Sequence, residues 1–521
     1  MSTYSFNQSW YYILPEISLL FFIILGLIIV GMANFQPQST IIEKKKKITP
    51  IIVWISLYGL FFTLIIMYLL SSNLNNGKVC FNSHIIVDMY STILKFGLVI
   101  TMFILLISSF WYIAGHTRPL MEFPVLLLLT TFCLFVLLSA YDLIVMFVAI
   151  IAFSLNIYVL LLTDFMNKSS REASVKYYYL STLSSGLIIG GILIAYLVFH
   201  TTNFLNITWI IHNWYLNDDL KSHAILLTIM LYFMITGFLF KLSAFPGHFW
   251  TPEVYDGAPH PITAIFILPI KIATFGIFLR LLSYVFHELH FLWSFILIIS
   301  SGMSMIVGAL LALVEFRIKR FIAYSSINQM GFMLIGIIAG TFEALRASLI
   351  FLFIYILMNL GIFILFLNTR DEKTNRSLTY ITDLKNFAAQ NHLVTVPFVV
   401  ILFSMAGIPP LAGFFGKFYL LLHAFEEQQY LLVIIGLVTS LISAYYYLRL
   451  IKLMWFDTPE NIETNPLIQI NFITFFTNHL EQILYLVEGL LVSFIIWQSF
   501  FFPILNLITY SCVMPLSNIP L

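Results

Sequence analysis

Long apolar runs recur from one end of the chain to the other, and short polar segments separate them. A transmembrane helix needs about 20 mostly apolar residues, and fourteen stretches meet that requirement. They lie at residues 11–32, 50–70, 92–113, 121–140, 142–163, 177–199, 223–245, 260–286, 291–314, 321–340, 344–367, 393–424, 430–455 and 480–510. The pattern therefore predicts an all-α polytopic membrane protein with about 14 transmembrane helices.

Two polar segments stand apart from these spans. Residues 201–222 form the longest interruption, and Trp209 and Trp214 within it suit the membrane interface, where tryptophan is enriched. Residues 458–479 are polar enough to connect two spans. We therefore expect no soluble domain.

The composition strengthens this interpretation and removes others. The 521 residues are 60% hydrophobic and 9% charged, whereas soluble proteins carry about 25% charged residues. A large soluble enzyme and a disordered chain are both excluded. The net charge of +1, without a basic arm, gives no indication of nucleic-acid binding.

The cysteines exclude one kind of chemistry. Cys80, Cys133 and Cys512 are far apart and form no CxxC spacing, so they cannot ligate an iron–sulfur cluster, and an odd count argues against a disulfide framework. We expect them to be small buried residues. The chain is therefore expected to carry no metal, cofactor or redox centre of its own.

Lysines and arginines are concentrated in every second loop between the predicted spans. Loops on the inner side are enriched in these residues. If the loop with Lys44–Lys47 faces the inside, that side receives seventeen of the 25. Four lie on the opposite side and four within spans. Both termini are therefore expected outside.

The N-terminal sequence bears on the cellular location. It has no basic n-region, and its first apolar run is too long for a signal peptide. The absence of an import sequence, together with 52 Phe and 27 Tyr, suits a chain made inside an organelle. The composition favours the mitochondrial inner membrane and leaves a bacterial plasma membrane open.

Three lysines fall in the middle of predicted spans, namely Lys241, Lys271 and Lys417. An ammonium at the centre of a bilayer costs at least about 2.5–3.5 kcal/mol, so such a residue usually faces a bundle interior or water and often moves ions. The alternative is that each side chain snorkels to an interface. A fourth lysine, Lys95, lies near the start of its span, and there we expect snorkelling.

Two further charged residues lie near the ends of spans. Glu16 is in the first span and Asp88 lies just before the third. We expect both to be interfacial or to contact other subunits.

Prolines accompany two of the central lysines. Pro246 follows Lys241, and Pro409 and Pro410 precede Lys417. Proline breaks a helix locally, which a membrane tolerates only where protein or water satisfies the freed backbone groups. A broken helix with an ionisable residue in each half of a chain is typical of repeat-built transporters. An ordinary kinked helix is the alternative. Lysine, unlike arginine, can exchange its proton, which favours proton transfer.

Three stretches of sequence resemble a known family. They are FKLSAFPGHFWTPEVYDGAP at 240–259, KRFIAYSSINQMG at 319–331 and GIPPLAGFFGKF at 407–418. A weaker one is EASVKY at 172–177. By these motifs the chain resembles the antiporter-like subunits of respiratory complex I. The resemblance extends over most of residues 140–455 and is thinner in the first 120 and last 60 residues.

The resemblance implies an architecture. The family fold consists of two inverted five-helix repeats, here expected at 121–286 and 291–456, with one broken helix in each. Three helices at 1–120 would precede the repeats. A connector and a last helix at 457–521 would follow them.

The resemblance also implies roles. Lys241 would be the proton-loaded residue of a first half-channel, Lys271 a midplane relay, and Lys417 the terminal residue of a second half-channel. Quinone reduction elsewhere in the complex would supply the energy. Flavin, iron–sulfur clusters and quinone would belong to partner subunits, and neighbouring antiporter-like subunits and lipids would surround this chain.

One family feature is missing. The family places a glutamate in the fifth span, where this chain has Ile151. That glutamate normally pairs with the lysine at position 241. Asp142 is nine residues away, about 13 Å along a helix, and cannot replace it. We hypothesise that Lys241 is therefore harder to protonate, because an opposite charge that favours the charged form is gone. A neighbouring subunit could also supply the carboxylate.

The sequence leaves several interpretations of the histidines and of the function open. His260 and His423 could each extend a proton path, or be hydrogen-bonded structural residues. The leading function is that of a proton-translocating subunit of NADH:ubiquinone oxidoreductase. A subunit of a multisubunit cation/proton antiporter is the first alternative. A membrane-arm subunit impaired in pumping is the second, and Ile151 is the reason to keep it.

Overall fold

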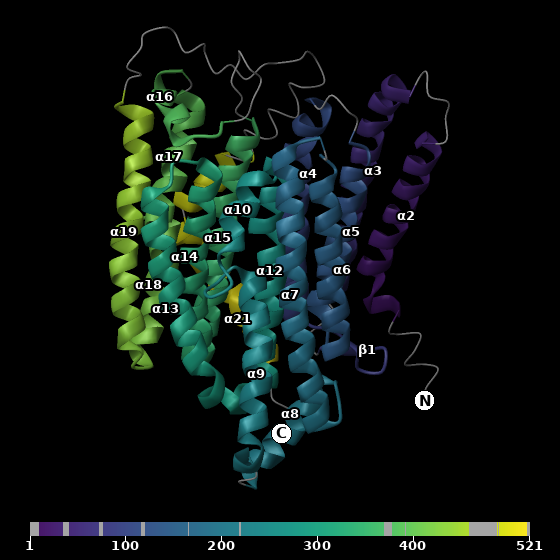
Figure 1. Ribbon diagram of the computed structural model, residues 1–521, viewed down its shortest axis with the longest axis vertical. Coiled ribbons are helices and arrows are strands. Elements are labelled where there is room, and N and C mark those ends of the chain that lie inside the picture. Colours follow the sequence, from purple (N-terminus) through teal and green to yellow (C-terminus); the bar gives the residue numbers. More distant parts are fainter. Residues whose placement is uncertain are drawn as a thin grey trace.

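A computed structural model shows a bundle of long helices that run nearly parallel to one another (Figure 1). It describes residues 10–517 except 35–40, 72–76, 116–119, 165, 218–219, 369–377, 391, 458–486, 488 and 497. In a bilayer every backbone polar group must be satisfied within the protein, so apolar segments of this length fold as helices. The predicted all-α polytopic class is confirmed.

The elements occur in the following order. The helices are α2 Leu14–Asn34, α3 Ile41–Ser71, α4 Met89–Gly115, α5 Glu122–Ser139, α6 Leu143–Leu162, α7 Lys168–Phe199, α8 Phe204–Leu216, α9 Leu220–Leu242, α10 Trp250–Gly257, α11 His260–Ile267, α12 Pro269–Arg280, α13 His290–Val314, α14 Ile318–Ala339, α15 Phe342–Asn368, α16 Phe387–Gln390, α17 His392–Ala406, α18 Ala412–Glu426, α19 Tyr430–Trp455 and α21 Gln498–Ser517. Short helical turns are η2 Leu281–Val285, η3 His287–Leu289 and η4 Ile381–Leu384, and two strands are β1 Lys78–Cys80 and β2 Ile85–Val87.

Twelve spans among the described residues are long and apolar enough to cross a membrane. The predicted span at 393–424 is instead divided into α17 and α18, each too short to cross alone. The last predicted span, 480–510, begins outside the described residues and overlaps α21 only in its second half. The number fourteen and the two repeats therefore stay predictions.

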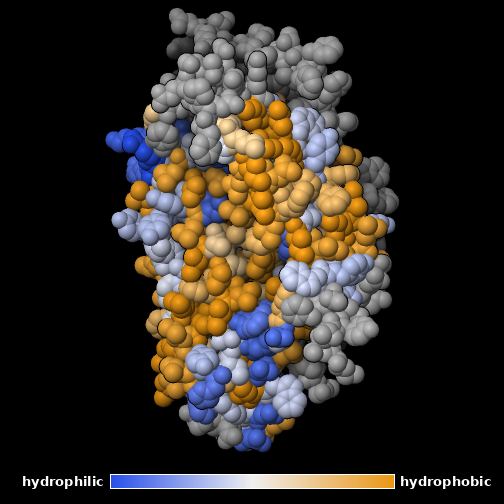
Figure 2. Space-filling model, turned by 90° about the vertical axis from the view of Figure 1, so that its right-hand side faces the viewer, coloured by the Kyte–Doolittle hydropathy of each residue, from blue (hydrophilic) through white to orange (hydrophobic). Residues whose placement is uncertain are grey.

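The surface agrees with a membrane setting. On the face shown in Figure 2, apolar side chains cover most of the middle, and polar side chains gather in a patch toward the lower end and at the upper left. Tyr58, Leu197 and Ile225 are among the large apolar side chains that are mostly exposed in this chain alone. Such a surface suits contact with lipid or with the apolar surfaces of other subunits.

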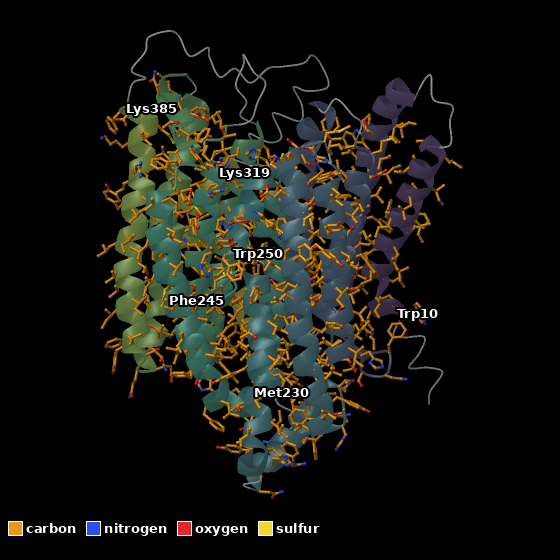
Figure 3. All side chains as sticks on the ribbon, viewed as in Figure 1. Trp10, Met230, Phe245, Trp250, Lys319 and Lys385 are labelled. Carbon is orange, nitrogen blue, oxygen red and sulfur yellow. The ribbon has the colours of Figure 1, made fainter. Side chains whose placement is uncertain are left out.

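The two ends of the bundle can be distinguished. Lys319 and Lys385, which the charge pattern assigns to the inside, lie in the upper part of Figure 3, whereas Trp10 lies lower. The hairpin of β1 and β2 and the short helix α8 lie at the lower end, which the charge pattern predicts to be the outer one (Figure 1). Neither element was predicted, because both occupy segments too short and too mixed in polarity to show a period.

The expectation for Lys95 and Glu16 was wrong. Lys95 on α4 does not reach an interface, because its Nζ donates a hydrogen bond of 2.5 Å to Glu16 Oε1 on α2 and both side chains are buried. Glu16 is therefore the partner of a buried cation inside this chain. A sequence places two such residues on separate helices but does not show that these helices pack together.

Asp88 is likewise an internal residue, contrary to the expectation. Its two carboxylate oxygens accept hydrogen bonds of 2.8 and 2.7 Å from Arg280 Nη2 at the end of α12. Arg280 also donates to the backbone oxygen of Leu138 and lies over the ring of Tyr90. This buried pair joins α4 to the segment of the chain that carries Lys271.

Candidate functional site

The first break lies directly after Lys241. Helix α9 ends at Leu242, Pro246 falls in the non-helical segment that follows, and α10 begins at Trp250. The indole of Trp250 donates a hydrogen bond of 3.0 Å to the backbone oxygen of Phe240, across the break. Gly247 is needed here, since a Cβ would lie 2.5 Å from Phe240 Cα. The labelled residues Phe245 and Trp250 lie at mid-height of the bundle (Figure 3).

Lys241 is buried between three helices. Its Nζ donates hydrogen bonds of 2.7 Å to Ser154 Oγ on α6 and of 2.7 Å to Ser181 Oγ on α7. It also lies 5.3 Å from the centre of the Phe153 ring. A cavity of about 20 Å³ adjoins it, lined in part by Tyr177 and Ser181, and that volume suffices for one water molecule.

Neutral hydroxyls thus hold the Lys241 ammonium, where the resemblance led us to expect a carboxylate. Ile151 lies on α6 one turn before Ser154. Among the residues that the structure describes, Lys241 forms no ion pair. Ser154 donates its own proton to the backbone oxygen of Ile150 at 2.5 Å, so its lone pairs are free to accept from Lys241.

Lys271 occupies the most enclosed span. Every residue of α12 is buried, and Lys271 is 1% exposed. Among the described residues none accepts a hydrogen bond from its Nζ, which lies 5.6 Å from the centre of the Tyr355 ring on α15. Pro269 begins α12 after a change of direction at Leu268. A buried ammonium with one aromatic neighbour is poorly solvated and is a candidate for proton exchange.

The second break precedes Lys417. Helix α17 ends at Ala406, Gly407 has a φ of 85° that favours glycine, and α18 begins at Ala412. Pro409 and Pro410 lie between the two helices. The interruption therefore exposes the last carbonyl groups of α17 to the interior of the bundle.

Lys417 forms hydrogen bonds with those carbonyl groups. Its Nζ donates to the backbone oxygens of Met405 and Ala406 at 3.0 and 3.3 Å, and to Ser443 Oγ on α19 at 3.4 Å. The C-terminal end of a helix carries partial negative charge, which favours a cation. Lys417 is thus held by a helix end, whereas Lys241 is held by side-chain hydroxyls.

A group of buried polar side chains extends between Lys271 and Lys417. We call it the polar seam, and its buried members are Asn328, Gln329, Tyr355, Asn359, Tyr446 and Tyr447. They come from α14, α15 and α19, and each is at most 2% exposed. The hydroxyl of Tyr446 interacts with the side chains of Asn328 and Tyr447, and Tyr447 also interacts with Gln329. Such contacts matter in a buried setting, because a polar group left unsatisfied there costs about 1–3 kcal/mol.

Contacts place the ends of the polar seam. The ring of Tyr355 is the aromatic neighbour of Lys271, and Tyr447 lies near Tyr355. The rings of Tyr446 and Tyr447 lie 4.5 Å apart. Both follow Ser443, the partner of Lys417, by about one turn of α19. These residues were not predicted as a group, because they lie on three different helices and their positions in the sequence show no common pattern.

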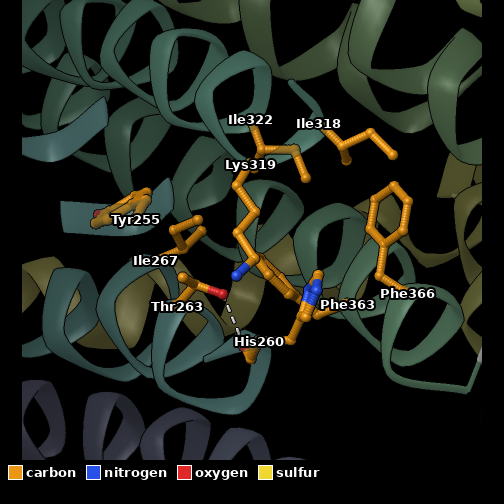
Figure 4. A pocket seen from close by; sticks show the side chains of 9 residues that line it. All are labelled: Tyr255, His260, Thr263, Ile267, Ile318, Lys319, Ile322, Phe363 and Phe366. Atoms are coloured by element: carbon orange, nitrogen blue, oxygen red, sulfur yellow. Dashed lines mark hydrogen bonds between the residues drawn. The ribbon is translucent and has the colours of Figure 1, made fainter. Parts of the chain in front are cut away.

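Two residues line a small cavity between α11 and α14, and only one of them was predicted as a site residue. His260 begins α11, and it lines a cavity of about 10 Å³ together with Lys319 of α14. Figure 4 shows the nitrogen atoms of both side chains facing this cavity. Lys319 Nζ also donates to the backbone oxygen of Ala258 at 2.5 Å. Lys319 was missed because the charge pattern counts it among the loop residues.

His423 lies on α18 and does not line this cavity. Its Nδ1 is 2.8 Å from Glu426 Oε2 near the end of α18, and Glu426 is largely exposed. Among the described residues no three His, Cys, Asp or Glu side chains gather as metal ligands would.

A polytopic bundle in which a buried lysine adjoins each of two broken helices is typical of the transporter class of membrane protein. Residues 140–443 match the family model described as "NADH:quinone oxidoreductase/Mrp antiporter, TM". The chain belongs to this family.

Similar proteins agree with this assignment. The chain is 36% identical to NADH-quinone oxidoreductase subunit N of Rhodospirillum rubrum over 448 residues, covering 85% of this chain and 87% of the relative. It is also 36% identical to NADH-ubiquinone oxidoreductase chain 2 of Marchantia polymorpha over 408 residues, covering 78% and 81%.

The fold is also that of a chain in a solved complex. A chain of respiratory complex I from Thermus thermophilus with bound aureothin matches with a TM-score of 0.71 and 22% identity, covering 93% of this chain and 98% of the other. At this identity the match concerns the fold alone.

Proposed function

We propose that this chain is a proton-translocating membrane-arm subunit of NADH:quinone oxidoreductase, of the type named subunit N or chain 2 in its relatives. The observation that carries the proposal is the burial of Lys241 and Lys417 beside the two breaks, in a chain of this family. Quinone reduction in other subunits would drive the proton movement.

The three lysines have successive roles in this proposal. Lys241 takes up a proton through the first half-channel, and the cavity beside it offers room for a water that delivers it. Lys271 passes the charge along the midplane. Lys417 is the last residue before release. The polar seam supports the final transfer, since its neighbouring hydroxyl and amide groups, with water molecules between them, would form a hydrogen-bonded row.

His260 is the candidate relay at the inner side. Its imidazole shares a cavity with Lys319, and a histidine titrates in the physiological range. Pro246, Pro409 and Pro410 interrupt the two helices so that backbone groups and water can meet the lysines. The breaks in α9–α10 and α17–α18 support two repeats at 121–286 and 291–456.

The redox chemistry belongs to the assembly in this proposal. Flavin, iron–sulfur clusters and quinone would be bound by partner subunits, and this chain would contribute to NADH:ubiquinone reductase activity through coupling alone. Its neighbours would be other membrane-arm subunits, including antiporter-like ones, and lipids. We place it in the mitochondrial inner membrane, with a bacterial plasma membrane as the alternative, since its relatives come from both settings.

Two specific observations support other functions. The family includes Mrp antiporters, and the buried lysines would also suit a subunit of a cation/proton antiporter without redox chemistry. Ile151, and the serines that hold Lys241 in place of a carboxylate, favour a membrane-arm subunit with impaired pumping.

One experiment separates the respiratory function from the antiporter. Source membranes are dissolved in mild detergent, run on a native gel, stained for NADH dehydrogenase activity, and the active band is analysed by mass spectrometry. We expect this chain in the active band. Its presence in a band that lacks flavin and iron–sulfur proteins would favour the antiporter and contradict the respiratory assignment.

A further inference from the structure

The short helix α10 is anchored at its inner end by α14. Asp256, in the last turn of α10, accepts hydrogen bonds on the same oxygen, Oδ2, from Arg317 Nη1 at 2.5 Å and from Arg320 Nε at 3.0 Å. Arg317 is the residue before α14, and Arg320 lies in its first turn. These contacts join the first predicted repeat to the second.

The anchor is charged and partly buried. The side chain of Asp256 is 15% exposed, against 47% for Arg317 and 37% for Arg320. The side-chain hydrogen bond to Asp256 raises the pKa of the Arg317 guanidinium, which therefore stays charged. Pairs at the surface are usually worth little, but one enclosed carboxylate shared by two guanidinium groups is a network that holds two helices in register.

A third contact strengthens the anchor. Between the two arginines, Lys319 donates from Nζ to the backbone oxygen of Ala258, the residue that ends α10. Three basic residues among positions 317–320, at the start of α14, thus bind the end of α10. The other end of α10 is fixed by the Trp250 indole on the Phe240 oxygen, and Phe240 immediately precedes Lys241.

We propose that Asp256 is a positioning residue: by tying α10 to α14 it sets the geometry of the break around Lys241 and links that lysine to the second repeat. Helix α14 also carries Asn328 and Gln329 of the polar seam. A shift of α14 that accompanies charge movement in the seam is thereby transmitted to α10. This inference rests on the proposed function of Lys241.

The same helix offers a matched control. Glu253 on α10 also forms an ion pair, with Lys176 of α7 at 2.7 Å. Both side chains of this pair are well exposed, at 54% and 40%, and it connects α10 only to a helix of the same repeat. If α10 needed any ion pair for its stability, loss of Glu253 would have the same effect as loss of Asp256.

The test uses the whole complex, reconstituted in proteoliposomes with NADH and quinone. Protons moved per electron are measured for Asp256→Asn, Asp256→Glu, Glu253→Gln, the double variant Arg317→Gln/Arg320→Gln, and Lys241→Met. We expect Asp256→Asn and the arginine variant each to lower the ratio toward that of Lys241→Met, with NADH oxidation retained. Asp256→Glu should keep the wild-type ratio because it retains the carboxylate. Glu253→Gln should also keep the wild-type ratio.

Combining Asp256→Asn with the arginine variant should cause no greater loss than either alone, since all three side chains serve one contact. If Asp256→Asn prevents assembly, the arginine variant decides the question in its place. A wild-type ratio in the assembled Asp256 and arginine variants, or an equal loss in Glu253→Gln, overturns the inference. The proposed function stands if Lys241→Met still lowers the ratio, and falls if Lys241→Met does not.

Discussion

At the scale of single residues, the two lysines beside the breaks are held by different chemistry. Lys241 donates to the hydroxyls of Ser154 and Ser181, whereas Lys417 donates to two backbone oxygens at the end of α17. Backbone oxygens are fixed by the fold and cannot be lost by substitution. The serine hydroxyls can be lost, so the environment of Lys241 is the one that substitution tests directly.

Removal of both hydroxyls should impair the first half-channel. Hydrogen bonds to a charged group are worth about 1.5–3 kcal/mol each, so we expect Ser154→Ala/Ser181→Ala to slow proton transfer through Lys241 by about tenfold or more. The measurement is the rate of NADH-driven proton uptake in proteoliposomes. Ser185→Ala is the control, because that hydroxyl is exposed and donates to the backbone oxygen of Thr182 on its own helix. Wild-type rates in the double variant would refute the role of the serines.

A carboxylate at position 151 should make Lys241 easier to protonate. Ile151 lies one turn before Ser154, and a negative charge there would favour the ammonium form. Proton-coupled turnover of Ile151→Glu is expected to persist to higher pH than in the wild type. Ile151→Gln, of similar size and without charge, should not change the pH profile. Identical profiles for Ile151→Glu and wild type would contradict the hypothesis.

The sequence predicted which lysines are central but not all of their partners. Lys241, Lys271 and Lys417 stand out because a charge is costly in an apolar run. The same reasoning failed for Lys95, whose partner Glu16 comes from another helix. Lys319 was overlooked for the opposite reason, because a lysine near a loop is ordinary. Pairings between helices depend on packing, which a single sequence does not contain.

At the scale of elements, the breaks require close approach of backbone to backbone. Gly413, in the first turn of α18, donates its N–H to Ser404 Oγ at 3.0 Å on α17. A Cβ at this glycine would collide with the backbone oxygen of Ser404. The two halves of the broken helix therefore contact one another through a residue without a side chain.

Gly413→Ala should consequently damage the second break. Overpacking costs about 1–3 kcal/mol, and here the obstacle is backbone that cannot move aside cheaply. We expect a lower thermal midpoint for the assembled complex and less proton transport. Gly186→Ala on α7 is the control, since a Cβ there meets nothing within 4 Å. Equal stability of the two variants would show that α17 and α18 do not pack as described.

Element boundaries were predictable where a proline interrupts a long apolar run. The prolines at 246, 409 and 410 lie between helices, as the sequence suggests. The hairpin of β1 and β2 and the helix α8 were not predicted. Their stability comes from contacts such as the hydrogen bond between Asn203 and the backbone oxygen of Ser83, which joins segments far apart in the chain.

At the scale of the whole molecule, a buried ion pair connects the N-terminal helices to the rest of the bundle. Asp88 at the start of α4 and Arg280 at the end of α12 are both nearly inaccessible. Removing one partner of such a pair leaves an uncompensated buried charge, which costs about 3–5 kcal/mol.

Asp88→Asn is therefore expected to lower the stability of the complex by about that amount. Asparagine keeps the hydrogen-bond acceptor that serves the N–H of Ser91, so the variant isolates the loss of charge. Thermal inactivation of NADH-driven proton transport is the measurement. Glu172→Gln removes an ion pair with Lys176 in which both side chains are well exposed and should leave stability nearly unchanged. Equal inactivation of the two variants would argue against a structural role for the Asp88 pair.

The central claim is that protons pass through the buried lysines, and one measurement tests it most directly. Protons moved per electron are compared in proteoliposomes for wild type, Lys241→Met, Lys417→Met and Lys452→Met. Lys452 lies in the last turn of α19 and is 70% exposed, so its loss removes a charge without touching the buried site. We predict that Lys241→Met and Lys417→Met assemble and oxidise NADH but move fewer protons per electron, whereas Lys452→Met matches the wild type. An unchanged ratio in both buried-lysine variants would contradict the account.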